Sequence, residues 1–510
     1  MVTFFSLLIQ NYMIAITGAG ASLSLGFLFI ALRMRKGFGK IKLNITYVSA
    51  ILHMYSIATG EAGPRDLVDA IAGTEQYGLL SRVFRRVRIL AEKFGYGYTD
   101  AVAIVAQETK PPLKDFLMRC TEVFTSRKPR DYLEIETTTV LEEYTGTLNR
   151  VFDNLRLLGG IFLTFQSAII FVIMTLAILT ILMAETNVVY MVYGISVLSL
   201  ITLCAVFIDI SPREPFFYKG QRPPRSYNMF RLVLSFLPLF AIPSLAIYLV
   251  AGPPLAFAIL GIGMILPGLY AYQLENYVNK IEAYYPTFIK AVSEQLMSVT
   301  DLKSVFSYVL FMELGPLKNI VSRALNRLKL GIGTEEVIDL MSSEAGSYIV
   351  FISNKIFLDA FRRGGDLVEV GKKLSNFIVK ILELRKKQLS VARSFEMMLL
   401  IMQPLLVILL VVLTSILNLF SISLINLPFF AFGEVPKEFI EVGNVVLVLL
   451  LTFLNALSMG SVKGGYWGSM LLYAGFLLLL SAATWFLAEK FIVGYITEAF
   501  SIIQEIPMAP

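Results

Sequence analysis

Apolar runs close to the roughly 20 residues that an α-helix needs to cross a bilayer recur along this chain. A helix satisfies its backbone hydrogen bonds internally, which the interior of a membrane requires. The pattern therefore predicts an all-α integral membrane protein with about eight transmembrane helices. The predicted spans are residues 9–32, 158–184, 187–208, 229–251, 255–272, 396–420, 443–461 and 468–488.

Two long polar stretches interrupt these spans, and each has the periodicity of amphipathic helices. We predict that each stretch folds into a helical domain of about six helices. The predicted order is a first transmembrane helix in 1–32, cytoplasmic helical domain 1 in 33–157, four transmembrane helices with a basic loop near 209–228 in 158–272, cytoplasmic helical domain 2 in 273–395, and three transmembrane helices with a short external tail in 396–510.

The composition adds an orientation to this picture. Hydrophobic residues make up 56% of the chain, and its mean hydropathy is +0.70. All but two of the 44 Lys and Arg residues fall on one predicted side of the membrane; the exceptions are Lys437 and Lys490. Because basic residues collect on the cytoplasmic side, we predict a multi-pass protein of the cytoplasmic membrane with both polar domains in the cytoplasm. The same bias explains the net charge of +6, so no nucleic-acid partner is expected.

The two polar stretches repeat one order of elements. In each, a basic helix ends at a Gly-x-Gly turn, and a long helix that continues into a span opens at an Asp about 33 residues later. Thr99 and Thr334, just after the turns, are predicted helix N-caps. The shared positions are Gly95, Gly97 and Asp131 in the first copy and Gly331, Gly333 and Asp366 in the second.

The basic helices have two interpretations. Their charged residues are Arg82, Arg85, Arg86 and Lys93 in the first copy and Arg323 and Arg327 in the second. They form either a solvated face of a positive-inside domain or a docking surface for an acidic partner. Within the spans the main polar groups are Gln166, Gln403 and Asn455. We expect them to form hydrogen bonds between helices, with a transport site as the alternative.

Sequence motifs of catalysis are absent. There is no Gly-x-x-x-x-Gly-Lys-[Ser/Thr] loop and no His-Glu-x-x-His motif. The single histidine, His53, lies on an amphipathic helix and is expected to be packed there. One histidine and two cysteines are too few for a metal cluster. We therefore expect no enzymatic activity, no cofactor and no metal site.

Taken together, the duplicated domains, the Gly-x-Gly turns and the long helices entering the membrane resemble the type II secretion system F family, the membrane platforms of type IV filament machines. The resemblance covers roughly residues 46–185 and 284–420. The extra spans are similar to those of the archaeal members, which serve archaella and pili. The resemblance implies a platform that couples a cytoplasmic, hexameric secretion ATPase to the extraction and assembly of prepilin or other filament subunits. A homodimer or higher oligomer and contacts with membrane lipids are also expected. The alternatives are a polytopic membrane transporter and a membrane scaffold without a filament.

Overall fold

The computed structural model describes residues 43–111, 113–126, 128–183, 186–212, 214–423 and 437–494. These ranges contain helices and no strand, so the predicted all-α membrane fold is confirmed. The helices of the polar lobes are α2 (Ile45–Ala58), α3 (Pro64–Gly73), η1 (Glu75–Tyr77), α4 (Leu79–Lys93), α5 (Tyr98–Glu108), α6 (Leu113–Thr125), α12 (Leu302–Val309), α13 (Leu317–Lys329), α14 (Thr334–Ala345) and α15 (Tyr348–Arg362). The remaining helices are α7 (Pro129–Met183), α8 (Thr186–Ile210), α9 (Arg225–Leu234), α10 (Pro238–Ala251), α11 (Pro253–Ser298), α16 (Leu367–Ser423), α17 (Lys437–Lys463), η2 (Trp467–Ser469), α18 (Met470–Leu487) and η3 (Ala488–Val493).

Seven helices in the described part of the chain are long and apolar enough to cross a membrane. They match seven of the eight predicted spans, whereas the predicted span 9–32 lies outside the described residues. The seven are Pro129–Leu176, Tyr190–Ile210, Arg225–Ala251, Pro253–Ser298, Leu367–Ile416, Phe439–Lys463 and Trp467–Phe491.

Three of these helices run without a break from a polar lobe into the apolar bundle. They are α7, α11 and α16, of 55, 46 and 57 residues. The domain borders predicted near residues 157, 272 and 395 fall inside them, so no change in backbone marks those borders. The borders therefore stay predictions.

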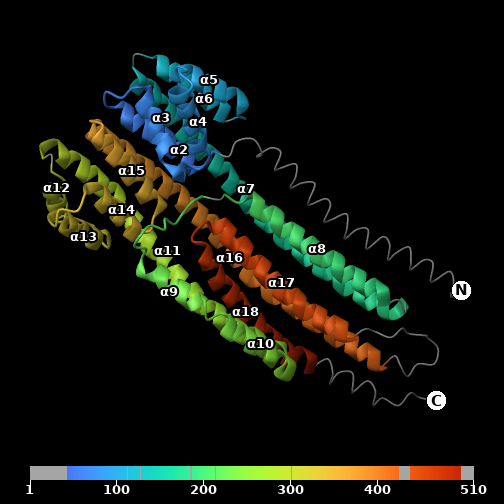
Figure 1. Cartoon of the computed structure of the whole chain (residues 1–510). Helices are drawn as coiled ribbons and strands as arrows, with labels where there is room; N and C mark the ends of the chain where they lie inside the picture. Colours follow the sequence, from blue (N-terminus) through green and yellow to red (C-terminus); the bar gives the residue numbers. More distant parts are fainter. Residues whose placement is uncertain are drawn as a thin grey trace, which may run out of the picture.

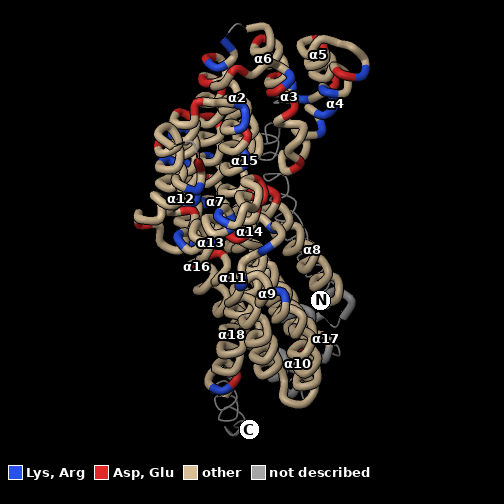
Figure 2. The backbone as a smooth tube through the Cα atoms, turned by 60° about the vertical axis from the view of Figure 1, so that its left-hand side comes forward, with Lys and Arg blue, Asp and Glu red and all other residues tan. Residues whose placement is uncertain are grey.

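The molecule is elongated (Figure 1). Helices α8, α10, α17 and α18 lie at one end, where α17 packs against α8 and α18 and α10 packs against α11. The α2–α6 lobe and the α12–α14 lobe lie at the other end, with α15 beside α2. Figure 2 shows Lys, Arg, Asp and Glu concentrated in the lobes, whereas the bundle is almost free of them. This segregation is what transfer of the bundle into lipid requires.

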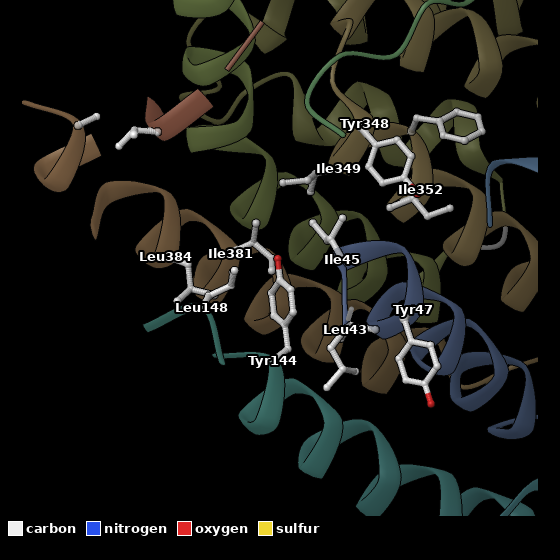
Figure 3. Packing of buried hydrophobic residues seen from close by; sticks show 14 of the residues in the cluster. Leu43, Ile45, Tyr47, Tyr144, Leu148, Tyr348, Ile349, Ile352, Ile381 and Leu384 are labelled. Carbon is white, nitrogen blue, oxygen red and sulfur yellow. The ribbon is translucent and has the colours of Figure 1, made fainter. Parts of the chain in front are cut away.

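A shared hydrophobic core joins the lobes to the bundle. Tyr144 of α7, Ile381 of α16 and Ile45 of α2 are buried in one cluster, and Tyr348 of α15 packs nearby (Figure 3). The cluster continues into both repeats and into the membrane helices. Because the repeats share this core, they form one packed unit.

The loop between the repeats, residues 211–224, packs against the second repeat. Phe217 forms an isolated antiparallel bridge with Ser347. The backbone N–H of Tyr218 donates to the Gly346 carbonyl at 3.1 Å, and that of Tyr348 donates to the Phe216 carbonyl at 3.1 Å. The loop therefore holds the turn between α14 and α15 in place.

Candidate functional site

The charged side chains of α4 lie on the surface and fall into two groups. Arg85 lies 3.5 Å from Glu75, and Arg86 lies 2.7 Å from Glu108. Arg88 lies 3.6 Å from Asp69, and Glu92 lies 3.3 Å from Arg65. Arg82 and Lys93 are exposed and form no ion pair with any described residue. The first repeat thus carries both neutralised and free cations on its basic helix.

The arginines of α13 are turned toward the protein. Arg323 Nε lies 2.8 Å from a carboxylate oxygen of Glu344, and Arg327 pairs with the other oxygen. The Arg327 side chain is only 11% exposed. Its pairing holds α13 to α14, so Arg327 has little surface to offer a partner. Sequence reasoning did not single out Glu344, because its partners lie on another helix.

The Gly-x-Gly turns act as helix stops. The first glycines, Gly95 and Gly331, have φ of 74° and 83°, a conformation that favours glycine after a helix end. The second glycines, Gly97 and Gly333, directly precede α5 and α14 and are their N-caps. The prediction that Thr99 and Thr334 are N-caps is therefore wrong: both lie inside the first helical turn, because the glycines' extended backbone already begins the helix.

The duplicated aspartates sit at the starts of the two long helices. Asp366 precedes α16, and its Oδ1 accepts a hydrogen bond from the Glu369 N–H at 3.1 Å. Asp131 is the third residue of α7 and lies in its first turn. A carboxylate at either place stabilises the positive end of the helix dipole. Both residues therefore have a structural role at a helix start.

Ion pairs tie α7 to α16 along their polar parts. The pairs are Arg130–Glu369, Glu134–Lys373 at 2.8 Å and Asp153–Lys387 at 3.3 Å. The first two have a signal in the sequence: a cation precedes an anion by four residues on α7, and the order is reversed on α16. Such reversed patterns are complementary when two helices lie side by side.

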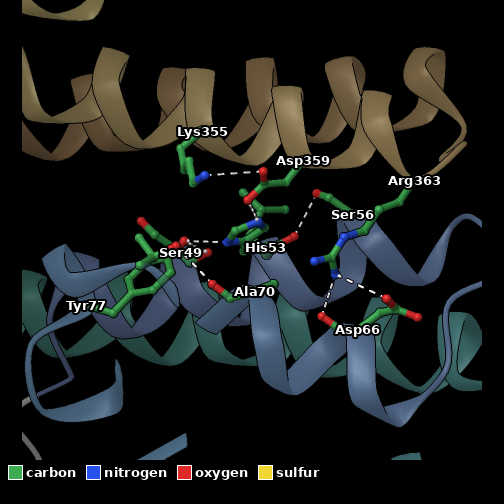
Figure 4. Close-up of polar contacts among 11 residues, drawn as sticks. Ser49, His53, Ser56, Asp66, Ala70, Tyr77, Lys355, Asp359 and Arg363 are labelled. Atoms are coloured by element: carbon green, nitrogen blue, oxygen red, sulfur yellow. Dashed lines mark hydrogen bonds and ion pairs between the residues drawn. The ribbon is translucent and has the colours of Figure 1, made fainter. Parts of the chain in front are cut away.

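His53 joins the first repeat to the second (Figure 4). Its Nδ1 lies 3.0 Å from the Tyr77 hydroxyl, and its Nε2 lies 3.1 Å from Asp359 of α15. Burial lowers the pKa of His53, although Asp359 opposes the shift. A neutral ring can accept from the Tyr77 hydroxyl at Nδ1 and keep its Nε2–H beside the Asp359 carboxylate. His53 is thus a packed residue in an interface between repeats.

Gln166 and Gln403 meet at one asparagine inside the bundle. Gln166 donates to Asn455 at 2.7 Å, and Asn455 donates to Gln403 at 2.8 Å. Gln403 in turn donates to Thr452 at 2.9 Å and to Ser481 at 3.0 Å. All five side chains are buried, and they come from α7, α16, α17 and α18. The network therefore joins four membrane helices through side-chain hydrogen bonds.

Comparison with known proteins identifies an archaeal relative. The chain is 24% identical to flagella accessory protein J of Methanocaldococcus jannaschii over 399 residues, which is 73% of this chain and 69% of that protein. No protein-family model matches the chain. No solved structure matches it either.

The match extends through most of both chains, and it accompanies two helical repeats joined to a bundle of membrane helices. The resemblance to archaeal platform proteins that was predicted from the sequence is therefore confirmed, because the chain is similar along most of its length to an archaeal flagella accessory protein.

Proposed function

We propose that this protein is the membrane platform of an archaeal type IV filament machine, which couples a cytoplasmic secretion ATPase to the extraction and assembly of filament subunits. The match to a flagella accessory protein over most of the chain carries the proposal. The platform itself is expected to hydrolyse no ATP, because its sequence has no phosphate-binding loop.

The continuous helices supply a route for mechanical coupling. Helices α7 and α16 begin in the two repeats and reach the buried glutamine network of the bundle. Ion pairs on their polar parts and hydrogen bonds at Asn455 connect them at both levels. A displacement of either repeat is thereby transmitted to membrane helices around Gln166 and Gln403.

Affinity purification from native membranes tests this function. We expect a secretion ATPase to co-purify with the protein, and we expect a deletion strain to lose its filaments while keeping the ATPase. A deletion strain with normal filaments would refute the proposal. If that strain instead lost the flux of a small solute, the transporter alternative would gain support.

Reporter fusions test the orientation, which places both repeats in the cytoplasm. Reporters after Ser126 and after Gly346 should give a cytoplasmic signal, because nearly all basic residues lie on that side. Reporters after Gly433 and at Pro510 should give an external signal. An external signal from either repeat would contradict the proposed arrangement.

A further inference from the structure

The basic helices of the two repeats end in the same way. The last helical residue is a lysine, Lys93 in α4 and Lys329 in α13. The next residue has a large apolar side chain that is exposed to solvent: Phe94 is 69% exposed and Leu330 is 81% exposed. A glycine with positive φ follows each of them. The two helices can therefore be aligned in sequence, residue by residue, from their C-terminal ends.

This alignment shows which cations the repeats share. Eleven residues before the terminal lysines lie Arg82 and Lys318, and eleven residues bring a helix back to nearly the same face. All four shared cations are exposed and form no ion pair with a described residue. The arginines of the two helices that are paired are Arg85, Arg86, Arg88, Arg323 and Arg327. The duplicated positions are thus the ones that remain free.

The turns that carry Phe94 and Leu330 close the two helix ends and leave both side chains largely exposed. At α13, Gly331 donates to the Leu328 carbonyl at 3.1 Å and Ile332 to the Arg327 carbonyl at 3.2 Å, which closes the helix end. A Cβ added at Gly95 or Gly331 would meet no atom within 4 Å. Each turn therefore presents a largely exposed apolar side chain beside a glycine that has open space around it.

We propose that these two ends are paired docking points for one acidic protein. We call them the Phe94 tip (Arg82, Lys93, Phe94) and the Leu330 tip (Lys318, Lys329, Leu330). Each tip fits an apolar pocket flanked by carboxylates. The inference rests on the proposed function, under which the partner is the secretion ATPase. Two like tips on one chain match the repeated sites of a multimeric ATPase, and engagement of both raises the avidity.

Charge and position favour a protein over the lipid surface as the occupant. Helices α4 and α13 lie in separate lobes away from the apolar bundle (Figure 1). The free cations orient and accelerate docking and make it sensitive to salt. The central apolar side chain supplies the desolvated contact that resists dissociation.

Binding of the purified cognate ATPase to the full chain in nanodiscs tests the tips. The variants are Lys93→Glu with Phe94→Ser, Lys329→Glu with Leu330→Ser, and all four changes together. We expect each pair to weaken binding about tenfold and the combination to weaken it at least about a hundredfold, as for central interface residues. Lys114→Glu and Lys372→Glu are matched controls, because both lysines are exposed and form no ion pair with a described residue. They should leave the Kd unchanged.

Cysteine labelling identifies what covers the tips. The native Cys120 and Cys204 are buried, so Phe94→Cys and Leu330→Cys would each supply one accessible thiol. Added ATPase should protect both thiols from a water-soluble maleimide, in neutral and in anionic nanodiscs alike. Protection by anionic lipid without ATPase would assign the tips to the membrane surface and overturn the inference. Unchanged ATPase binding by the fourfold variant would refute the docking role of the two tips and leave the proposed coupling standing. Failure of the wild-type protein to bind the ATPase would overturn the proposed coupling as well.

Discussion

Glu108 and Glu344 occupy the same place in the two repeats, 11 residues after the second glycine of the turn, yet their surroundings differ. Glu108 pairs with Arg86 at the surface, where the two side chains are 50% and 60% exposed. Glu344 is 11% exposed and takes both Arg323 and Arg327. The hydroxyl of Tyr277 on α11 also donates to the Glu344 carbonyl. The same layout is thus open to solvent at this position in the first repeat and closed in the second.

Removing the carboxylate of Glu344 or of Glu108 should show the difference in stability between the two repeats most clearly. Glu344→Gln leaves the buried Arg327 without its counter-charge, and we expect it to destabilise the second repeat by about 3 kcal/mol. Glu108→Gln should cost less than about 1 kcal/mol, because water already screens that pair. Hydrogen exchange of α13 and of α4 measures both effects. Equal effects in the two repeats would contradict the comparison.

Because Glu344 pairs with both arginines of α13, reversing the charge of these arginines should affect the structure of the second repeat as well as any binding. Arg323→Glu with Arg327→Glu places two further carboxylates beside a buried one, so the second repeat should lose structure as well as any binding. Lys318 and Lys329 are the matching positions for a test of docking, because neither is paired with a described residue. The double arginine variant should therefore become protease-sensitive where a Lys318→Glu variant does not.

The contact between the repeats should respond to pH through two groups of opposite sign. The folded pKa of His53 lies below its ordinary value because of burial, so His53 makes stability fall as the pH drops below about 6.5. Burial raises the pKa of Glu214, in the inter-repeat loop, from 4.5 to about 7. Its contribution is complete below pH 4.5 and is lost as the pH rises through about 7.

Substituting either Glu214 or His53 should leave the pH dependence of stability that the other residue causes. We expect Glu214→Gln to give a thermal midpoint that rises with pH between 5 and 7. The free energy of unfolding should rise by at most about 1.4 kcal/mol per pH unit for one proton. His53→Gln should give a midpoint that falls over the same interval. His53 is the only histidine in the chain, so no other imidazole contributes. If both variants kept the pH profile of the wild-type protein, the interface between the repeats would not contribute to the pH dependence of stability.

A smaller difference is expected inside the membrane, where the repeats contribute one glutamine each. Gln403 bonds to Asn455, Thr452 and Ser481, whereas Gln166 bonds to Asn455. Gln403→Leu should therefore destabilise the bundle more than Gln166→Leu. A double-mutant cycle of each glutamine with Asn455→Leu should give a coupling energy of about 0.6–2 kcal/mol. A coupling of zero for both would mean that the network adds no stability.

The sequence was enough for the helices, because each is encoded by local periodicity and by glycines at its ends. The spans, the basic helices and the Gly-x-Gly stops followed from such patterns. The contacts that close the second repeat did not, because they join distant positions: Glu344 with α13, and His53 with Asp359. The N-caps were misplaced by one or two residues, since glycine in an extended conformation can start a helix without a side-chain acceptor.

The residues of the glutamine network are translated at different times. Gln166 is translated 289 residues before its partner Asn455. At the usual 5–20 residues per second, about 15–60 s separate the two. During that interval the first half of the protein holds an amide in the bilayer without the partner that will satisfy it. A nascent chain released before α17 is complete would therefore carry an exposed polar group inside the membrane, a feature by which quality-control proteases can distinguish it from the finished protein.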